Sequence, residues 1–346
     1  MKLLVLISAC VLISATVLGT AVSSSQPWEG PTSGPAAQNG KSVIFIASDL
    51  RNGGVAAVSQ AFMEAAKVLK WKAEILDGFG ERKNIRKQLK EAIKSQPDGI
   101  ILGGFDSVDY IRYLTAKDSS KIRFVGWHST SKPGPSKYLF ANVTTDPLMV
   151  AEVAAKQIQK SNNKHGVGVI IITDRRFSIA TAKTLKMKKI IESSPGQHVI
   201  AVEDVSISQA KAEMSSLVRT WNQRYGAAWT HTLAINDIYF DYMKDSLEKY
   251  NRKDIINIAA GDGSLNAIRR IKDGEWSQRI TIAEPLQAQG WQLADELNRA
   301  FANRKPSGYV SSLIVVNKKY LDAIQSENVE MKSQAKDQYT KIWLQK

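Results

Sequence analysis

Polar side chains that can hold a small ligand follow three short apolar runs in the second half of this chain. The run LAI is followed by Asn236 and Asp237, the run INIAA by Gly261 and Asp262, and the run ITIA by Glu284. Amide and carboxylate groups bind hydroxyl groups in fixed directions, so a rigid set of them can distinguish epimers. In open α/β sheets, ligands bind just outside the carboxyl ends of parallel strands. These residues therefore predict a site for a small polar ligand held by hydrogen bonds.

The elements that must position these residues are short strands that alternate with helices. Apolar strand-like runs lie at 42–47, 73–76, 99–102, 123–127, 139–143, 166–172, 198–202, 232–235, 256–260 and 280–283. Windows with helical apolar spacing lie between them, such as 55–69, 85–93, 150–158 and 210–218. This alternation predicts right-handed βαβ units and parallel sheets. Because there are more units than one sheet usually holds, we expect two α/β lobes.

The order of these motifs resembles that of the ribose-type periplasmic sugar-binding proteins, the substrate-binding subunits of bacterial ABC importers. In that family one strand ends in Asn-Asp and the next in Asp-Gly, a helix ends in Lys-Asp-Gly, and a further strand ends in Gln or Glu. Here the helix ends at Lys272-Asp273-Gly274, with cations in its last turn and glycine just beyond it. The likeness runs from about Lys41 to Tyr320.

The resemblance implies the type I periplasmic binding protein fold, with two Rossmann-like lobes joined by three crossings of the chain. Lobe one would hold 41–143 and 285–311, and lobe two would hold 146–284 and 312–346. It also implies a monomeric solute-binding protein that captures a small sugar or polyol between the lobes, without a cofactor or a metal, and delivers it to an ABC permease. A sensory protein that presents its ligand to a membrane receptor kinase is the alternative.

In lobe one, the resemblance places Ser48 and Asn52 at ligand-binding positions, and Asp49 lies in the same loop. Gly54 and Val55 stand where the family carries aromatic residues that sandwich a sugar ring. Asn52 and Asp49 are equally suited to cap the helix that follows.

Two further strands of lobe one end in aromatic residues. Phe105 offers a stacking surface, while Asp106 suits a cap of the next helix. Trp127 and His128 replace the Asp-Arg pair of ribose binders, and a tryptophan there can cover a sugar face with its indole N–H free to donate. The alternative for Trp127 is a place in the core.

In lobe two, Arg175 or Arg176 could hold a carboxylate or phosphate, or could lie in an exposed loop before a helix. By resemblance, Lys183 takes the place of a sugar-binding arginine, and Ile207 falls near a further aromatic position. Asn236, Asp262 and Glu284 complete the predicted ligand set. We expect a neutral sugar or polyol, because the acidic residues would repel an anion; a sugar acid or sugar phosphate is the alternative.

The N-terminus predicts a cleavable secretory signal peptide over 1–23. Lys2 is the only charge before Glu29, and an apolar run with small residues after it follows. The run is slightly short for a membrane anchor, which needs ~20 apolar residues. Cys10, the single cysteine, lies in a sequence like a lipoprotein box and is a secondary candidate for lipidation. Residues 24–40, rich in Ser, Pro and Gly, predict a flexible leader.

A formal net charge of +14 raises the question of nucleic acid binding. The lysines and arginines are spread along helices among glutamates, which is typical of solvated helix faces, and no nucleic acid-binding motif occurs.

Asp262 and Glu284 could in principle serve as a glycosidase pair, but both match ligand-binding positions of the family. The histidines lack metal-ligand spacing in the sequence. The tail 322–346 is expected to dock on lobe two.

Overall fold

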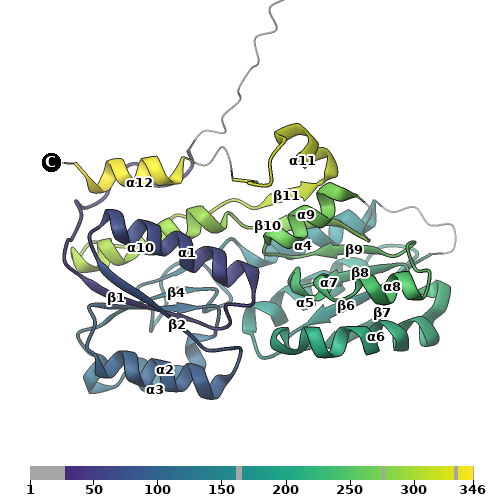
Figure 1. The fold of residues 1–346 in the computed structure, drawn as a ribbon, viewed down its shortest axis with the longest axis horizontal. Coiled ribbons are helices and arrows are strands. Elements are labelled where there is room, and N and C mark those ends of the chain that lie inside the picture. The colour runs from purple at the N-terminus through teal and green to yellow at the C-terminus, as the bar shows by residue number, and fades with distance from the viewer. Residues whose placement is uncertain (1–27, 161–165, 275–276, 331–333, 346) are drawn as a thin grey trace, which may run out of the picture.

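The computed structural model describes residues 28–160, 166–274, 277–330 and 334–345, which form two α/β lobes side by side (Figure 1). The strands are β1 (Ser42–Ala47), β2 (Lys72–Asp77), β3 (Gly99–Gly103), β4 (Arg123–Trp127), β5 (Ala141–Val143), β6 (Val167–Thr173), β7 (Gln197–Asp204), β8 (His231–Ala234), β9 (Ile256–Ala259), β10 (Gln278–Ala283) and β11 (Ile314–Asn317). The prediction of two lobes with parallel sheets is confirmed. Each strand expected from the sequence is present among β1 to β10, while β11 was not expected.

Helices connect these strands and cover the sheets. The α-helices are α1 (Gly53–Val68), α2 (Arg82–Lys94), α3 (Ile111–Leu114), α4 (Pro147–Gln159), α5 (Ser178–Glu192), α6 (Ala210–Tyr225), α7 (Ile238–Asp241), α8 (Lys244–Lys249), α9 (Leu265–Asp273), α10 (Leu286–Phe301), α11 (Lys318–Ile324) and α12 (Ala335–Trp343). Short 3-10 turns are η1 (Ser107–Tyr110), η2 (Lys117–Ser119), η3 (Ile207–Gln209) and η4 (Gly226–Ala228). Helix α9 ends at Gly274, whose left-handed φ of 72° suits glycine.

The sheet of lobe one has the order β2-β1-β3-β4-β5, with every pair parallel. Alternate residues of β1 face opposite sides of this sheet. Val43 and Phe45 pack in a core with α1 and α10, whereas Ile44 and Ile46 pack in a second core with α2. A continuous apolar strand is therefore explained by burial on both faces.

The sheet of lobe two has the order β11-β10-β9-β8-β6-β7 and is parallel except for the edge strand β11. One large core includes α4, α5, α6 and strands β6, β8 and β9. A smaller one lies under α9, α11 and β11. The chain passes between the two sheets after β5, after β10 and after α10.

The C-terminal helix packs on lobe one, whereas the sequence analysis placed the tail on lobe two. Trp343 belongs to the core shared by α1 and α10, and its ring stacks on Trp291 with centroids 5.5 Å apart. The indole N–H of Trp343 donates to Asp295 at 2.9 Å. The apolar spacing along α12 predicts a buried face, but only the structure shows that this face packs on α10.

The N-terminal segment 28–40 forms no helix or strand but lies against lobe one, which differs from the flexible leader expected. The ring of Trp28 contacts those of Tyr309 and Tyr339, with centroids 5.9 and 5.5 Å apart. The backbone N–H of Ala37 donates to the carbonyl of Trp343 at 2.9 Å. The expected signal peptide and Cys10 lie outside the described residues. Within the described part of the chain, no helix is both long and apolar enough to cross a membrane.

Candidate functional site

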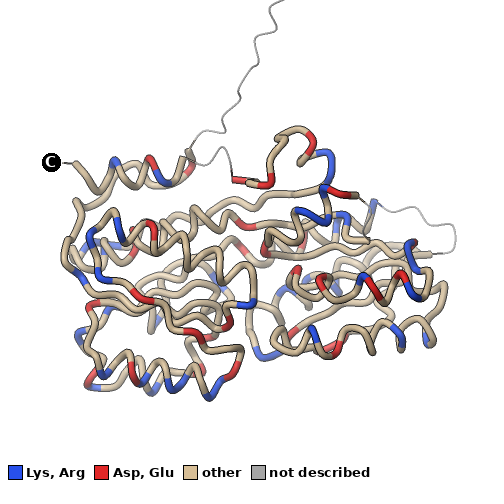
Figure 2. Tube along the Cα trace, in the orientation of Figure 1, with Lys and Arg blue, Asp and Glu red and all other residues tan. Residues whose placement is uncertain are grey.

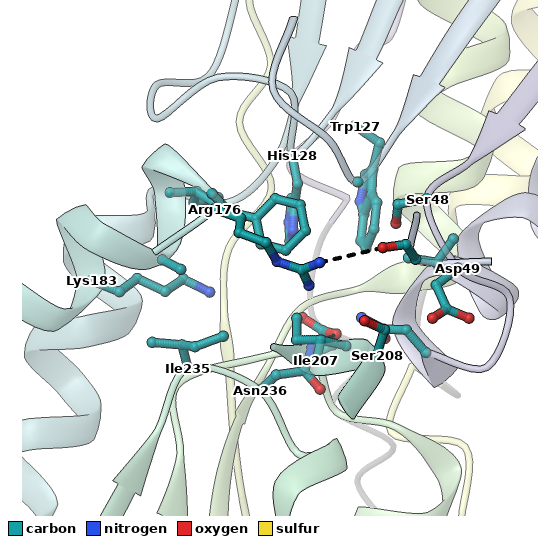
Figure 3. A pocket seen from close by; sticks show the side chains of 18 residues that line it. Ser48, Asp49, Trp127, His128, Arg176, Lys183, Ile207, Ser208, Ile235 and Asn236 are labelled. Atoms are coloured by element: carbon teal, nitrogen blue, oxygen red, sulfur yellow. Dashed lines mark hydrogen bonds between the residues drawn. The ribbon is translucent and has the colours of Figure 1, made fainter. Parts of the chain in front are cut away.

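A cavity of about 60 Å³ lies between the lobes, where the carboxyl ends of both sheets meet (Figure 3). That volume has room for a few water molecules, so the lobes are nearly closed on one another. Most of the ligand set expected from the sequence lines it: Ser48, Asp49, Asn52, Trp127, His128, Lys183, Asn236 and Asp262. Strands far apart in the sequence thus bring these side chains to one place.

Asp262, after β9, lies at the centre of the polar groups. Its Oδ2 accepts a hydrogen bond of 2.5 Å from Nδ2 of Asn236, which follows β8. Asp262 also reaches across to α1 of lobe one, because a Cβ added to Gly54 would clash with Asp262 Oδ2. Where the resembled family has an aromatic residue, the glycine here leaves room for a carboxylate. Burial raises the pKa of Asp262, although His128 and Lys183 nearby act in the opposite direction.

Glu284, at the end of β10, lies behind the cavity rather than in its lining. Its Oε2 contacts Nε2 of His128 at 3.0 Å and accepts hydrogen bonds from Gln289 Nε2 at 3.0 Å and the Thr145 backbone N–H at 3.2 Å. Burial alone would raise the pKa of Glu284, but His128 and Lys183 outweigh it and hold the pKa below its usual range. Glu284 therefore joins the crossing between the lobes to the polar groups of the cavity.

Lys183 projects from α5 into the cavity and is 2% exposed. Its ammonium donates to the carbonyl of Ala260 at 2.8 Å and lies 3.8 Å from Glu284 Oε1. Among the described residues, Glu284 Oε1 has no hydrogen-bond partner. Lys183 thus balances a buried carboxylate and has further N–H groups for an acceptor on a ligand.

One set of side chains has atoms placed as metal ligands would be. His128, Asp262 and Glu284 each offer such an atom, all within 4.8 Å of one another. A histidine and two carboxylates suit a divalent transition metal. However, the ammonium of Lys183 already brings positive charge to Glu284, so this cluster is balanced in part without an ion and we assign it no metal.

Trp127 lines the cavity from the end of β4, but its indole N–H is not free for a ligand, contrary to the expectation from the sequence. It donates to Gln289 Oε1 at 2.7 Å. The ring stacks on that of His128, with centroids 3.9 Å apart and planes 10° from parallel. Trp127 therefore offers apolar surface, and it is also part of the core of lobe one.

Each lobe holds one arginine beside the cleft in a pair with an aspartate two residues earlier. Arg51 forms two hydrogen bonds with Asp49, at 2.8 and 2.7 Å. Arg176 pairs with Asp174 in the same way, at 2.9 and 2.7 Å, and also donates to the Gly80 carbonyl of lobe one at 3.3 Å (Figure 3). Both guanidinium groups are thereby neutralised locally.

Asn52 both lines the cavity and caps α1, so the two alternatives stated for it hold together. Its Oδ1 accepts from the Gly54 backbone N–H at 2.9 Å.

Asp106 does not cap η1 with its side chain. Instead, it accepts hydrogen bonds from Ser178, at the start of α5 in the other lobe.

Two other expected residues lie away from this cavity. Phe105 is buried in the core under α2, where its ring packs edge-on against Tyr110 at 5.0 Å. Arg175 is exposed, and its backbone N–H donates to Asp204. The neighbouring Arg176 lines the cavity in its place.

Several lining residues were not among the predicted ligand set. They are mostly apolar: Val55, Phe177, Ile179 and Ile235, while Ile207, which the resemblance placed near an aromatic position, also lines the cavity. Ile235 directly precedes Asn236, and Phe177 and Ile179 flank the start of α5. Their position at strand ends and helix starts was the available signal, but apolar side chains there look like ordinary core residues in the sequence.

Comparison with known proteins bears on this arrangement. No curated protein sequence matches the chain. Solved structures similar to it include an ABC transporter solute-binding protein from Agrobacterium vitis with bound allitol (16% identity, TM-score 0.70, 83% of this chain and 98% of that one). Another is a solute-binding protein from Bacillus halodurans C-125 with bound myo-inositol (16% identity, TM-score 0.70, 84% and 98%). A third is a galactofuranose-binding protein (16% identity, TM-score 0.71, 86% and 99%).

At such identities these structures show a shared fold. The sequence itself carries the family assignment, since residues 43–305 match the model of the periplasmic binding protein domain, which is most of the chain. Two lobes with mostly parallel sheets and a cavity between them agree with that match. This chain belongs to the periplasmic binding protein family.

Proposed function

We propose that this protein is an exported solute-binding protein that captures a small neutral sugar or polyol between its lobes and delivers it to an ABC permease. The observation that carries the proposal is the set of polar groups that both lobes present to one cavity. Ser48, Asn52 and His128 come from lobe one, and Lys183, Asn236 and Asp262 from lobe two. A ligand bound by both sets would hold the lobes together, and hinged closure is a common motion of two-lobed binding proteins.

The charges of the site support a neutral ligand. Arg51 and Arg176, two cations beside the cleft, are each paired with an aspartate. Two buried carboxylates, Asp262 and Glu284, outnumber the one buried ammonium of Lys183. The two carboxylates would therefore repel an anionic ligand, and the two arginines, already paired with aspartates, would not offset that repulsion. Elsewhere, lysines and arginines are spread among acidic residues over both lobes (Figure 2), in agreement with solvated helix faces.

The contacts of Glu284 support binding without catalysis. A glycosidase needs two carboxylates that flank the scissile bond. Glu284 does not line the cavity, and His128, Gln289 and the Thr145 N–H hold one of its oxygens. Its place outside the cavity lining therefore supports ligand binding rather than cleavage of a glycosidic bond.

The relatives support a polyhydroxylated solute and a role in import. Allitol and myo-inositol, the ligands of two solved neighbours, are both polyols. Export rests on the expected signal peptide at 1–23. Genes for a permease and an ATPase beside this one would support delivery to an importer, whereas a histidine kinase gene there would favour sensing.

Calorimetry with monosaccharides, polyols and sugar acids tests the proposal. We expect at least one neutral compound to bind one per chain in the micromolar range or tighter, with no turnover. Trp127 lines the cavity, so binding should also change tryptophan emission. Binding of sugar acids alone, lost in added salt, would show that the ligand is anionic. Turnover of any compound would overturn the proposal.

A further inference from the structure

Three isoleucines form one wall of the cavity. Ile179 comes from the first turn of α5, Ile207 begins η3, and Ile235 directly follows β8, so three separate elements of lobe two converge there. Ile179 and Ile235 are only 8% and 5% exposed. Figure 3 shows Ile207 and Ile235 on the side of the cavity opposite Trp127 and His128.

The facing wall combines the polar groups of Ser48, Asn52 and His128 with apolar surface. Trp127 has its only donor engaged by Gln289. Val55, from α1, and Phe177, just before α5, add further carbon surface. The polar groups of lobe two lie close to one another: Asn236 donates a hydrogen bond to Asp262, and the ammonium of Lys183 lies near the carboxylate of Glu284. The three isoleucines therefore form an aliphatic patch among polar groups, since Ser208 follows Ile207 and Asn236 follows Ile235 in the lining.

We propose that the ligand is a sugar with one apolar edge, for which a deoxy sugar bearing a methyl group is the simplest class. This inference rests on the proposed function and specifies its ligand. The hydroxyl groups would contact Asp262, Asn236 and Lys183, and the methyl group would lie against Ile179, Ile207 and Ile235. A hydroxyl packed against the isoleucine side chains themselves loses its hydrogen bonds to water, whereas a methyl group gains from leaving water.

The size of the expected preference follows from how apolar pockets discriminate. Such a pocket rejects an added hydroxyl by up to about a hundredfold. We therefore expect the deoxy member of a matched pair to bind about tenfold to a hundredfold more tightly than its parent.

Calorimetry with matched pairs tests this directly. Fucose against galactose, and rhamnose against mannose, each in both enantiomers, differ within a pair only in a methyl or hydroxymethyl group. A preference for the deoxy sugar in the pair that binds supports the inference. Equal or tighter binding of the parent overturns it and leaves the proposed function standing. If no sugar or polyol binds to the folded protein, both fail.

Substitutions in the wall separate specificity from folding. Ile207→Thr and Ile235→Thr each replace an ethyl group by a hydroxyl, which also shortens the side chain, and we expect either to reduce the preference for the deoxy sugar several-fold. Ile200→Thr is the matched control, because Ile200 is half-buried on β7 and does not line the cavity. A preference unchanged in both wall variants, with melting temperatures like that of the control, would overturn the role of the wall.

Discussion

The carboxylate of Asp106 in lobe one accepts two hydrogen bonds from Ser178 in lobe two, one from the backbone N–H at 2.7 Å and one from the hydroxyl at 3.0 Å. Ser178 begins α5, and the N-terminus of a helix offers free N–H groups and a favourable dipole to a negative charge. Arg176 donates to the Gly80 carbonyl across the same cleft. The lobes are thus joined at the rim by contacts that need no ligand.

Asp106→Ala should therefore favour the open arrangement. The hydrogen bonds between Asp106 and Ser178 stabilise only the closed arrangement of the lobes, in which a solute is bound. Because the substitution removes them, we expect the affinity for the solute to fall about tenfold. Calorimetry measures the affinity, and small-angle scattering should show a larger radius of gyration without ligand. Asp118→Ala, at an exposed aspartate of η2, is the control. An unchanged radius and affinity in Asp106→Ala would show that the contact does not influence closure.

Asp262→Ala should weaken binding far more than folding. The truncation leaves ligand hydroxyls unpaired, which costs ~1–3 kcal/mol, or about tenfold or more in affinity. Because burial raises the pKa of Asp262, its ionised form opposes folding, and that penalty grows as pH rises through the folded-state pKa. The variant should thus melt no lower than the parent at neutral pH. If it unfolds instead and the folded remainder binds normally, Asp262 is structural.

Two buried glutamates of the α10 region should make stability fall as pH rises. Glu330 accepts from the backbone N–H groups of Gln287 and Ala288, and Glu296 accepts from Ser307. Burial raises the pKa of each from 4.5 to about 7. The folded protein holds protons that the unfolded chain releases, so this contribution is full below pH 4.5 and is lost as pH rises through about 7.

Melting temperatures between pH 4 and 8 measure this contribution. The double variant Glu296→Gln with Glu330→Gln should melt with a smaller fall across that range than the parent. Glu91→Gln, at an exposed position of α2, should keep the parent's pH dependence. A double variant that follows the parent's curve would mean that other groups control the pH dependence.

The C-terminal helix should stabilise lobe one through Trp343. Trp343 is 1% exposed, stacks on Trp291 and donates to Asp295, whereas the next residue, Leu344, is 60% exposed. Removing a large buried aromatic side chain costs ~3–5 kcal/mol, so Trp343→Ala should lower the free energy of unfolding by about that amount. Leu344→Ala, its matched control, should change it by less than ~0.5 kcal/mol. Denaturant unfolding measures both, and equal effects would refute the assignment.

Local patterns carry most of the information about this fold. The apolar runs that became β1 to β10 are bounded by turns and separated by helical spacing, and such patterns specify each element with little help from its neighbours. Strand β11 was missed because it is a short edge strand next to an expected crossing. The tail was placed on the wrong lobe because an amphipathic helix encodes a buried face but not the surface that covers it.

The sequence by itself also determined that Asn236 and Asp262 stand at the ends of strands, and its resemblance to the family indicated Ser48, Asn52 and Lys183; all five line one cavity. Strand order and twist bring those ends together whatever the details of packing. Residues whose role depends on the exact approach of the two lobes were not determined in this way.

Only the tertiary structure decided those roles. Glu284 lies behind the cavity and contacts His128, the indole N–H of Trp127 donates to Gln289, and Asp106 caps a helix of the other lobe. Each depends on a partner 72 to 162 residues away in the chain. Hydrogen bonds require their atoms to meet within a few tenths of an ångström, and the packing between lobes sets such distances, while the local sequence sets only which groups are available.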